Sequence, residues 1–487
     1  MYNEREHFMK EAEKQIKKYC PSRGNDPYRL RYHVMPPSGL LNDPNGLIQY
    51  RGIYHLFYQW NPFETKHGAK CWAHCTSNDL IHWRQEDIAL APADWFDKNG
   101  CYSGSAIEHN GKMHIFYTGN VKGPSGKRES YQCLAVSGDG SNFTKKGPVV
   151  TLPDGFTAHF RDPKVVRRNG RFYMLIGAQD IDNQGCCVMF VSDDLSSWEY
   201  QGVLAGTHRN NLGYYGYMWE CPDLLSWAGK DVLLVCPQGM EQEGNRFQNI
   251  YQSGYFVGVV DDKKGIFQTE GFTELDSGFD FYAPQTMTDE NGRRILFAWM
   301  GITDASEQNH PTIANGWIHA MTIPRELSLK GDKIIQRPAV ELKKLRKSHT
   351  AYTNVFIQDT VELPQVSGKS LELLMEEIDT SEAADFTISF GGSASLSYEV
   401  NRQRLVFRRV SLLDQSWEQR VCEVDELEKL HIFMDTSSLE IFVNDGGIVF
   451  TSRFFPKPEN DSLQFSATGQ VSCHLQKWAL GSMQSKR

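Results

Sequence analysis

The hydrophobic and polar positions of the first two thirds of the chain repeat with a nearly constant period. Five segments begin with a glycine, continue with polar or aromatic residues and end in a short apolar run typical of a β-strand. The five glycines are spaced by 59, 59, 59 and 63 residues: Gly52, Gly111, Gly170, Gly229 and Gly292. Such a period with several short strands per unit is typical of a radial β repeat. The sequence therefore predicts a five-bladed β-propeller over residues 28–331.

The pattern changes after the PREL motif, which spans Pro324 to Leu327. Residues 332–350 contain a proline and several charged residues and predict a linker with a short helix. Alternating segments in residues 351–487 predict the short antiparallel strands of a β-sandwich. The charged residues 1–27 predict a solvent-facing helical extension. The expected fold class is all-β, a five-bladed propeller followed by a C-terminal β-sandwich.

A polar or aromatic residue precedes each repeat glycine by eight to ten positions. These residues are Asp43, Ser103, Asp162, Glu220 and Tyr282. Residues at the same distance from the repeat glycine occupy corresponding positions in the blades of a radial repeat. The innermost strand of every blade lines the central channel. We therefore expect these side chains to converge at one mouth of the channel.

The segment NDPNG (Asn42 to Gly46) also carries a strong turn signal. A similar signal recurs at Asn444-Asp445-Gly446 between two strand-like runs of the predicted sandwich. We expect the second to be an ordinary hairpin turn. The first is expected to be a turn at the channel mouth of the first blade, because it shares the phase of Asp162 and Glu220.

Three carboxylates would meet in this pocket, and their residue types predict glycoside hydrolysis. That reaction needs two carboxyl groups on either side of an acetal, one ionised and one protonated. Arg161 directly precedes Asp162 and should favour its ionised form, whereas Trp219 and Cys221 flank Glu220 and should raise its pKa. Aromatic residues expected to line the pocket are Trp60, Trp72, Tyr102, Tyr282 and Trp299.

NDPNG, FRDP (Phe160 to Pro163) and WECPD (Trp219 to Asp223) resemble the three acidic motifs of glycoside hydrolase family 32. SGSA at Ser103, DFYAPQT at Asp280 and GW…MTIPREL from Gly316 match further segments of that family, so the resemblance spans roughly residues 28–487. It implies a retaining β-fructofuranosidase that works through a fructosyl-enzyme intermediate, with the two working carboxyls about 5–5.5 Å apart.

The resemblance also assigns roles. Asp43 would be the nucleophile, Glu220 the acid/base, and Asp162 the residue that stabilises the transition state. The substrate-binding residues that it implies are Leu41, Asn42, Pro44, Gln59, Trp60, His67, Tyr102, Ser103, Arg161, Cys221, Tyr282 and Trp299.

His67 stands where many invertases of the family have a tryptophan, and the segments around Gln238 and Tyr251 are similar to those of intracellular bacterial members that act on sucrose 6-phosphate. The resemblance therefore implies sucrose 6-phosphate, and sucrose itself, as substrates. A dianionic phosphate requires cationic or hydrogen-bond-donating partners, for which His67, Lys70 and Arg246 are candidates.

Composition narrows the remaining choices. The formal net charge of −9 gives no reason to expect nucleic acid or an anionic membrane as a partner. The N-terminus lacks the apolar region of a signal peptide, and no apolar run has the length of a membrane helix, so we expect a cytoplasmic protein with reduced cysteines. No cluster of side chains has metal-ligand spacing, so neither a metal nor another cofactor is expected.

The sequence leaves three alternative functions open. It also allows the protein to form a homo-oligomer. The chain could hydrolyse fructo-oligosaccharides or sucrose without a preference for phosphate. It could be a non-catalytic sugar-binding propeller. It could also be an inverting propeller glycosidase of the arabinanase type, in which the two carboxyls stand more than about 6.5 Å apart.

Overall fold

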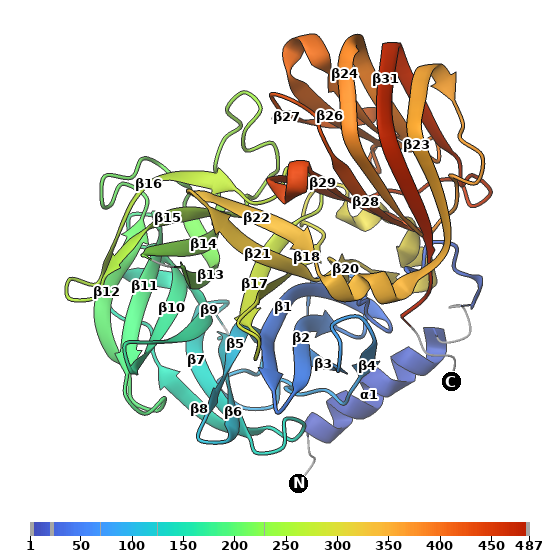
Figure 1. Ribbon diagram of the computed structural model, residues 1–487. Coiled ribbons are helices and arrows are strands. Elements are labelled where there is room, and N and C mark those ends of the chain that lie inside the picture. Colours follow the sequence, from blue (N-terminus) through green and yellow to red (C-terminus); the bar gives the residue numbers. More distant parts are fainter. Residues whose placement is uncertain (1–3, 20–23, 69, 124, 228, 484–487) are drawn as a thin grey trace.

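The computed structural model describes residues 4–19, 24–68, 70–123, 125–227 and 229–483 of the 487-residue chain. Five small antiparallel sheets stand around a common axis, and a larger sheet of nine strands follows them in the chain (Figure 1). The predicted five-bladed propeller and C-terminal sandwich are confirmed.

Each of the first four blades is a continuous meander of four strands. The first blade contains β1 (Gly39–Tyr50), β2 (Ile53–Asn61), β3 (Cys71–Ser77) and β4 (Trp83–Gln85). The second contains β5 (Cys101–His109), β6 (Lys112–Lys122), β7 (Arg128–Ser137) and β8 (Thr144–Val150). The third contains β9 (Phe156–Arg168), β10 (Arg171–Asp180), β11 (Gly185–Ser192) and β12 (Glu199–Gly206). The fourth contains β13 (Met218–Trp227), β14 (Lys230–Gln238), β15 (Gly254–Asp261) and β16 (Ile266–Glu274).

The fifth blade is interrupted by an insertion that also closes the ring. Its main strands are β17 (Tyr282–Thr288), β18 (Arg294–Met300), β21 (Arg325–Lys330) and β22 (Lys333–Pro338). The insertion between β18 and β21 contains the 3₁₀-helices η2 (Glu307–Asn309) and η3 (Pro311–Asn315) and the short strands β19 (Trp317–Ile318) and β20 (Ala320–Met321). Because β20 pairs with β18 while β19 pairs in parallel with β1, the insertion joins the last blade to the first.

The repeat glycines lie in the turn between the first and second strand of each blade. Their φ angles are 72–82°, in the left-handed region that glycine adopts without steric cost. In the first three blades the turn has two residues, and the residue before the glycine also has a positive φ, as a type I′ hairpin requires. These turns therefore account for the period that the sequence displays.

The innermost strand of every blade is irregular at the residues that share the repeat phase. The pairing register shifts between Leu41 and Pro44 in β1, and the corresponding shifts are Cys101/Gly104, Arg161/Lys164, Glu220/Asp223 and Tyr282/Gln285. Such β-bulges bend a strand and redirect its side chains.

The NDPNG segment belongs to this set and is not a turn. Residues 42–46 lie inside the continuous strand β1, so the turn expected there is wrong. A bulge explains the misleading signal, because it tolerates a proline, which lacks an N–H, within a strand. By contrast, Asn444–Gly446 forms the 3₁₀-helix η6 between two paired strands and is the hairpin connection that we predicted.

The C-terminal sheet folds into two layers. Its strands are β23 (Arg346–Val361), β24 (Leu371–Phe390), β25 (Ala394–Glu399), β26 (Arg404–Val410), β27 (Trp417–Glu423), β28 (Leu430–Asp435), β29 (Ser438–Val443), β30 (Ile448–Arg453) and β31 (Leu463–Leu480), with η5 (Val400–Arg402) after β25. Residues 371–375 of β24 pair with β28, whereas residues 385–390 pair with β25. One long strand therefore belongs to both layers, and buried side chains such as Leu373, Ile388 and Phe465 fill the space between them.

Two domain boundaries differ from the expected ones. Residues 333–338, assigned to the linker, form β22, because they pair with β21 and bury Ile334 at the outer edge of the fifth blade. The connector is correspondingly short and contains the 3₁₀-helix η4 (Val340–Leu345).

The N-terminal extension contains helix α1 (Glu4–Tyr19), which is not wholly solvent-facing because Ala12 is buried and Phe8 contacts Phe63. Residues 1–3 and 20–23 of that extension lie outside the described part.

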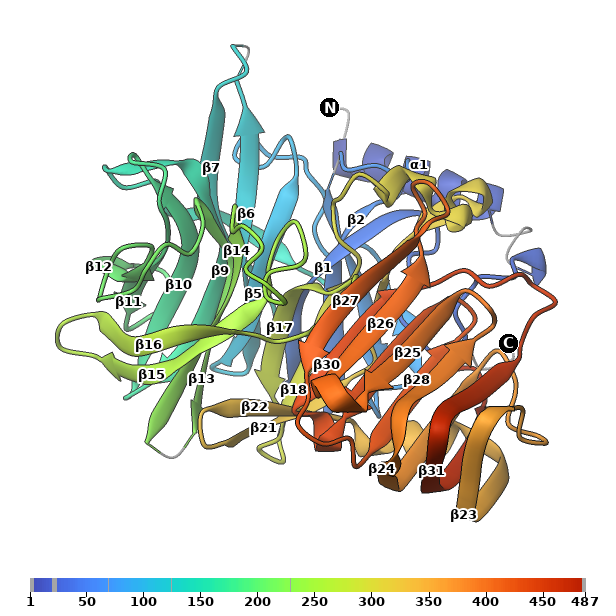
Figure 2. The same cartoon turned by 90° about the horizontal axis from the view of Figure 1, so that it is seen from above.

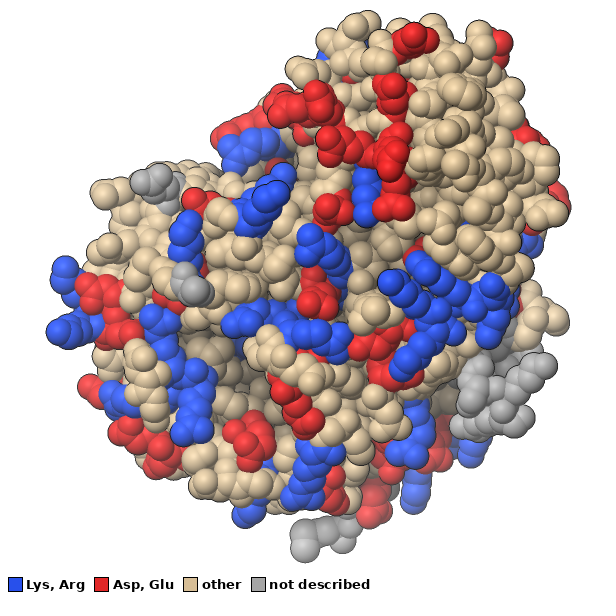
Figure 3. All heavy atoms as spheres, viewed as in Figure 1, with Lys and Arg blue, Asp and Glu red and all other residues tan. Residues whose placement is uncertain are grey.

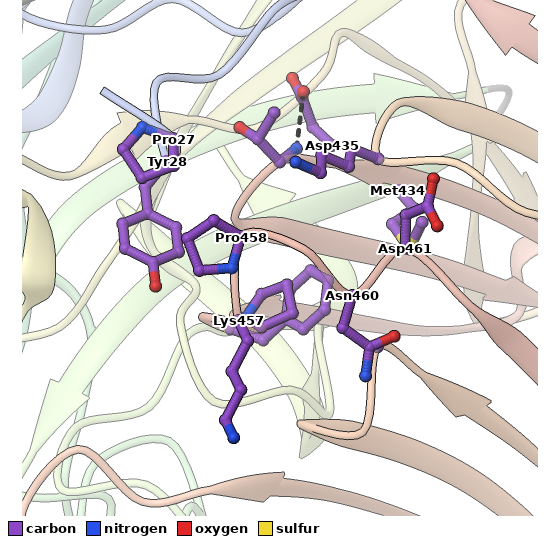
Figure 4. Close-up of a pocket in the computed structure, with 13 residues that line it drawn as sticks. Pro27, Tyr28, Met434, Asp435, Lys457, Pro458, Asn460 and Asp461 are labelled. Carbon is purple, nitrogen blue, oxygen red and sulfur yellow. Dashed lines mark hydrogen bonds between the residues drawn. The ribbon is translucent and has the colours of Figure 1, made fainter. Parts of the chain in front are cut away.

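The segment after α1 crosses from the propeller onto the sandwich. Asp435 accepts hydrogen bonds from the backbone N–H groups of Arg31 and Tyr32, at 2.8 and 3.1 Å. Figure 4 shows Pro27 and Tyr28 facing Pro458 across a small cavity of about 10 Å³, which has room for no more than about one water molecule. This contact therefore serves packing between the domains.

A buried ion network holds the two domains together. Arg325, from the PREL motif, contacts Asp276 at 3.1 Å and Glu440 of the sandwich at 2.7 Å, and all three side chains are fully buried.

Figure 2 shows the sandwich beside the propeller, and on the face drawn in Figure 3 basic and acidic side chains are interspersed over both domains. No helix in the described ranges combines the length and the apolar character needed to cross a membrane.

Candidate active site

A pocket of about 620 Å³ lies at one mouth of the propeller channel, on the side where the β6–β7 hairpin projects (Figure 2). All five blades contribute to it, and its size is typical of a small-molecule site. Its lining residues are Asn42, Asp43, Gln59, His67, Gly68, Lys70, Pro92, Lys98, Asn99, Tyr102, Lys122, Arg161, Asp162, Glu220, Gln238, Tyr251, Tyr282, Trp299 and Thr303. The expected convergence of Asp43, Asp162, Glu220 and Tyr282 is therefore observed.

Asp43 is held in place by neutral donors. Ser103 Oγ donates to its Oδ2 at 2.5 Å, Gln59 Nε2 lies 3.4 Å from the same oxygen, and Asn42 Nδ2 donates to Oδ1 at 3.1 Å. Burial raises the pKa of Asp43 above its usual range, and the charge of Glu220 adds to this effect, while the bond from Ser103 acts in the opposite direction. These contacts orient a carboxylate in the pocket wall without neutralising it.

Glu220 has a different, strongly donating environment. Arg161 donates from both Nε and Nη2 to Oε1, at 2.9 and 2.7 Å, while Gln238 Nε2 and Tyr282 Oη each donate to Oε2 at 2.6 Å. Burial acts to raise the pKa of Glu220, but the charge of Arg161 and the bonds from Tyr282 and Arg161 outweigh it and lower the pKa. The raised pKa that we expected from Trp219 and Cys221 is therefore wrong.

Asp162 sits in the bulge of β9 with φ of 66°. The backbone N–H of Cys221 donates to its Oδ2 at 3.1 Å. Burial raises its pKa to about 7, and the charges of Glu220 and Asp43 add to the rise, whereas the charge of Arg161 lowers it. Arg161 therefore acts on Asp162 in the expected direction, but burial outweighs it. Arg161 also reaches across to the next blade and donates to Glu220.

A line of hydrogen bonds connects Asp43 to the insertion of the fifth blade. Glu307 Oε1 lies 3.1 Å from His67 Nε2, and His67 Nδ1 lies 3.0 Å from Lys70 Nζ. Lys70 in turn donates to Asn42 Oδ1, and Asn42 donates to Asp43. Burial lowers the pKa of Lys70 to about 8, although the charges of Asp43 and Glu307 favour its protonated form. This chain fixes the amide of Asn42 and therefore the carboxylate beside it.

An aromatic wall covers the side of the pocket formed by the fourth and fifth blades. Tyr282 and Trp299 meet edge to face with ring centroids 6.2 Å apart, and Tyr251 packs against Tyr282 at 5.9 Å. Trp299 Nε1 is buried and has no hydrogen-bond partner among the described residues. This nitrogen lies beside Gly301 and the imidazole of His319.

Several residues expected in the pocket lie behind its wall instead. Trp60 is buried and donates to the backbone oxygen of Ser38, and Trp72 donates to that of Tyr102. The remaining residues of this kind are Leu41, Pro44, Ser103 and Cys221, of which the last two still support Asp43 and Asp162 directly. Arg246 lines a separate cavity and is directed to the backbone of Phe272.

The sequence reasoning missed Lys98, Asn99, Lys122 and Thr303, which the pocket includes. They lie in loops or at strand ends, out of phase with the repeat, and therefore gave no periodic signal. In the described ranges, no group of three or more His, Cys, Asp or Glu side chains is arranged to hold a metal ion. The chemistry available in the pocket is that of coupled carboxylates beside one guanidinium, which is the chemistry of acetal cleavage.

Comparison with known proteins matches this geometry to a family. The family description "Glycosyl hydrolases family 32 N-terminal domain" matches residues 33–338, and "Glycosyl hydrolases family 32 C terminal" matches residues 341–479. The sucrose-6-phosphate hydrolase of Bacillus subtilis (strain 168) is 49% identical over 469 residues, covering 96% of this chain and 98% of that protein. That of Klebsiella pneumoniae is 44% identical, covering 93% of this chain and 94% of that protein.

Solved structures agree in fold. The sucrose-6-phosphate hydrolase from Lactobacillus gasseri superposes with a TM-score of 0.86 at 32% identity and covers 97% of both chains. A mutant of a Bombyx mori family 32 β-fructofuranosidase in complex with sucrose superposes with a TM-score of 0.85 at 30% identity, covering 99% of this chain and 100% of that one.

Proposed function

The chain belongs to glycoside hydrolase family 32, and from that premise we propose that it hydrolyses the β-D-fructofuranosyl bond of sucrose 6-phosphate, and of sucrose, to release fructose. One observation carries the proposal: Asp43, Asp162 and Glu220 meet in one pocket of about 620 Å³. The relatives named sucrose-6-phosphate hydrolase support the choice of substrate.

In the first step, a carboxylate oxygen of Asp43 forms a bond to the anomeric carbon of the fructosyl unit. The bond from that carbon to the glycosidic oxygen breaks, and Glu220 gives its proton to the departing oxygen. In the second step, Glu220 accepts a proton from water, whose oxygen replaces Asp43 on the anomeric carbon. Retention follows from the two successive displacements.

Asp162 and Arg161 bind the hydroxyls of the fructosyl ring in this mechanism. A bound sugar competes for the guanidinium of Arg161 and displaces water from Glu220. Both effects raise the pKa of Glu220, because the charged carboxylate loses stabilisation. In this proposal, substrate binding therefore raises the lowered pKa of Glu220 and shifts this group toward the protonated form that the first step requires.

We place the reaction in the cytoplasm, where a phosphorylated sugar is retained. The ten cysteines within the described ranges are all free thiols, in keeping with a reducing compartment.

Two comparisons test the proposal: sucrose 6-phosphate with sucrose as substrates, and the wild type with Asp43→Asn. The wild-type protein should give a higher kcat/KM with sucrose 6-phosphate than with sucrose, and it should release fructose from both. Asp43→Asn should lose nearly all turnover and keep its folded structure, as measured by circular dichroism. Full retention of turnover in Asp43→Asn would overturn the role of the nucleophile, and binding of sugar without any hydrolysis by the wild type would indicate a binding protein.

Glu220 and Asp162 are distinguished by the leaving group. Glu220→Gln should slow cleavage of sucrose far more than cleavage of a fructoside with a good leaving group, such as a nitrophenolate, which departs without a proton. Asp162→Asn should slow both substrates to a similar extent. The reverse pattern would assign the proton donor to Asp162, whose pKa of about 7 makes it the rival candidate.

A further inference from the structure

The active-site pocket contains two lysines that form no ion pair with an acidic side chain in the described part of the chain. We propose that Lys98 and Lys122, together with the side-chain amide of Asn99, form the site that binds the phosphate of sucrose 6-phosphate. This inference rests on the function proposed above and assigns its phosphate to particular residues.

The other cations of the pocket are already engaged. Arg161 donates twice to Glu220, and Lys70 donates to Asn42 and contacts His67. Neither Lys98 nor Lys122 forms an ion pair with a carboxylate in the described ranges, although both line the pocket. Both residues are solvent-exposed, so their charges are available to a ligand that enters from the mouth.

Backbone and side-chain bonds hold these three residues next to one another. The N–H of Lys122 donates to Asn99 Oδ1 at 2.7 Å, and the N–H of Asn99 donates to the backbone oxygen of Asn120 at 3.1 Å. Because its Oδ1 is occupied as an acceptor, Asn99 keeps its NH₂ group as a donor. These bonds, and the adjacency of Lys98 and Asn99 in the chain, bring two lysines and one amide to the same part of the pocket lining, a set of donors that suits the oxygen atoms and double charge of a phosphate monoester.

The candidates from the sequence fit this task less well. His67 uses both ring nitrogens, for Lys70 and for Glu307, and the carboxylate of Glu307 would repel a phosphate. Lys70 is almost fully buried, and Arg246 lies at another cavity. We therefore assign to His67 and Lys70 the role of positioning Asn42. The phosphate is bound by the loop before β5 and the end of β6.

The experiment compares sucrose 6-phosphate with sucrose for six proteins. These are the wild type, Lys98→Ala, Lys122→Ala, the double variant, Lys122→Arg, and Lys127→Ala as the matched control. Lys127 is exposed on the same β6–β7 hairpin and does not line the pocket. A charge-retaining Lys122→Arg variant separates loss of charge from loss of packing.

Lys98→Ala and Lys122→Ala should each lower kcat/KM for sucrose 6-phosphate about tenfold, the effect of losing one charge-assisted contact, and the double variant should lose more, whereas Lys127→Ala should leave it unchanged. Activity on sucrose should stay within about twofold, which also shows that the variants fold. Glucose 6-phosphate, used as a product inhibitor of sucrose hydrolysis, should inhibit the wild type and Lys127→Ala much more strongly than the double variant. Lys122→Arg should keep most of the preference.

Two results would overturn the inference in distinguishable ways. If the wild type prefers the phosphorylated substrate and the double variant keeps that preference, the phosphate binds elsewhere in the pocket. If the wild type hydrolyses sucrose but shows no preference, the proposed substrate fails and the phosphate site fails with it.

Discussion

Replacing Glu440 by glutamine tests whether the buried ion network joins the two domains into one stable unit. Glu440 lies in β29 of the sandwich and is completely buried. Its carboxylate accepts hydrogen bonds from Arg325 Nη2 at 2.7 Å, from the backbone N–H of Ile323 at 2.9 Å and, from the N-terminal segment, His33 Nε2 at 3.0 Å. The substitution keeps the size of the side chain and removes its charge.

The expected loss of unfolding free energy is about 3–5 kcal/mol, which is typical when one partner of a buried ion pair is removed. Arg325 would keep Asp276, Gln336 and Thr451 as acceptors, so its charge would be only partly compensated. A domain of ordinary stability has about 5–15 kcal/mol in total. The loss should therefore be large enough to appear clearly in a urea titration followed by tryptophan fluorescence.

The pH dependence of the difference gives a second check. Burial acts to raise the pKa of Glu440, but the charge of Arg325 and the bond from His33 lower it. A lowered pKa stabilises the fold above the unfolded value of about 4.3, and this contribution disappears as the pH falls. The difference in unfolding free energy between the wild type and Glu440→Gln should therefore decrease toward zero at acidic pH.

His33 sets the upper limit of that pH window. Burial acts to lower its pKa, but the bonds to Asp435 and Glu440 raise it above the ordinary value. A raised histidine pKa stabilises the fold below about 6.5, and the contribution is lost as the pH rises through the raised value.

The control is Glu426→Gln, an exposed substitution on the same domain, which should change the unfolding free energy by less than about 0.5 kcal/mol. A change below about 1 kcal/mol for Glu440→Gln, or a gap independent of pH, would refute the reasoning.

Two further predictions concern the pocket. Ser103→Ala removes a hydrogen bond that holds down the pKa of Asp43, so that pKa should rise further. Because Asp43 must be ionised to attack, the acid limb of kcat/KM against pH should move to higher pH, and an unmoved limb would contradict this. Lys70→Met removes the donor to Asn42, so kcat/KM for sucrose should fall at least tenfold, whereas the exposed Lys66→Met should leave it unchanged; equal rates for the two variants would count against a positioning role.

The sequence revealed the propeller because its signal is repeated. Each repeat glycine occupies the same left-handed turn position, and each phase-related residue occupies a bulge of an innermost strand. A period of this kind depends on backbone geometry that is the same in every blade. The residues Asp43, Asp162 and Glu220 were therefore found together without any knowledge of their contacts.

The protonation of these carboxylates could not be predicted in the same way. Adjacent positions in the chain suggested that Arg161 acts on Asp162, and its charge does lower the pKa of that group, but burial has the larger effect. Arg161 also reaches Glu220 on the next blade, 59 residues away in the sequence. Electrostatic partners across blades follow from tertiary structure, and no local pattern records them.

The insertion of the fifth blade shows why the site needs more than its repeat. The repeat places a carboxylate at the mouth of the channel, and Gln59 of β2 accepts a hydrogen bond from the amide of Asn42 beside it at 3.1 Å. Glu307, from the insertion, completes the line through His67 and Lys70 to Asn42. The same insertion closes the ring through β19 and leads directly into Arg325, the first residue of β21, which contacts the sandwich. Ring closure, domain contact and orientation of Asp43 are therefore linked through one segment, so a change that loosens the sandwich is expected to act on catalysis through Asn42.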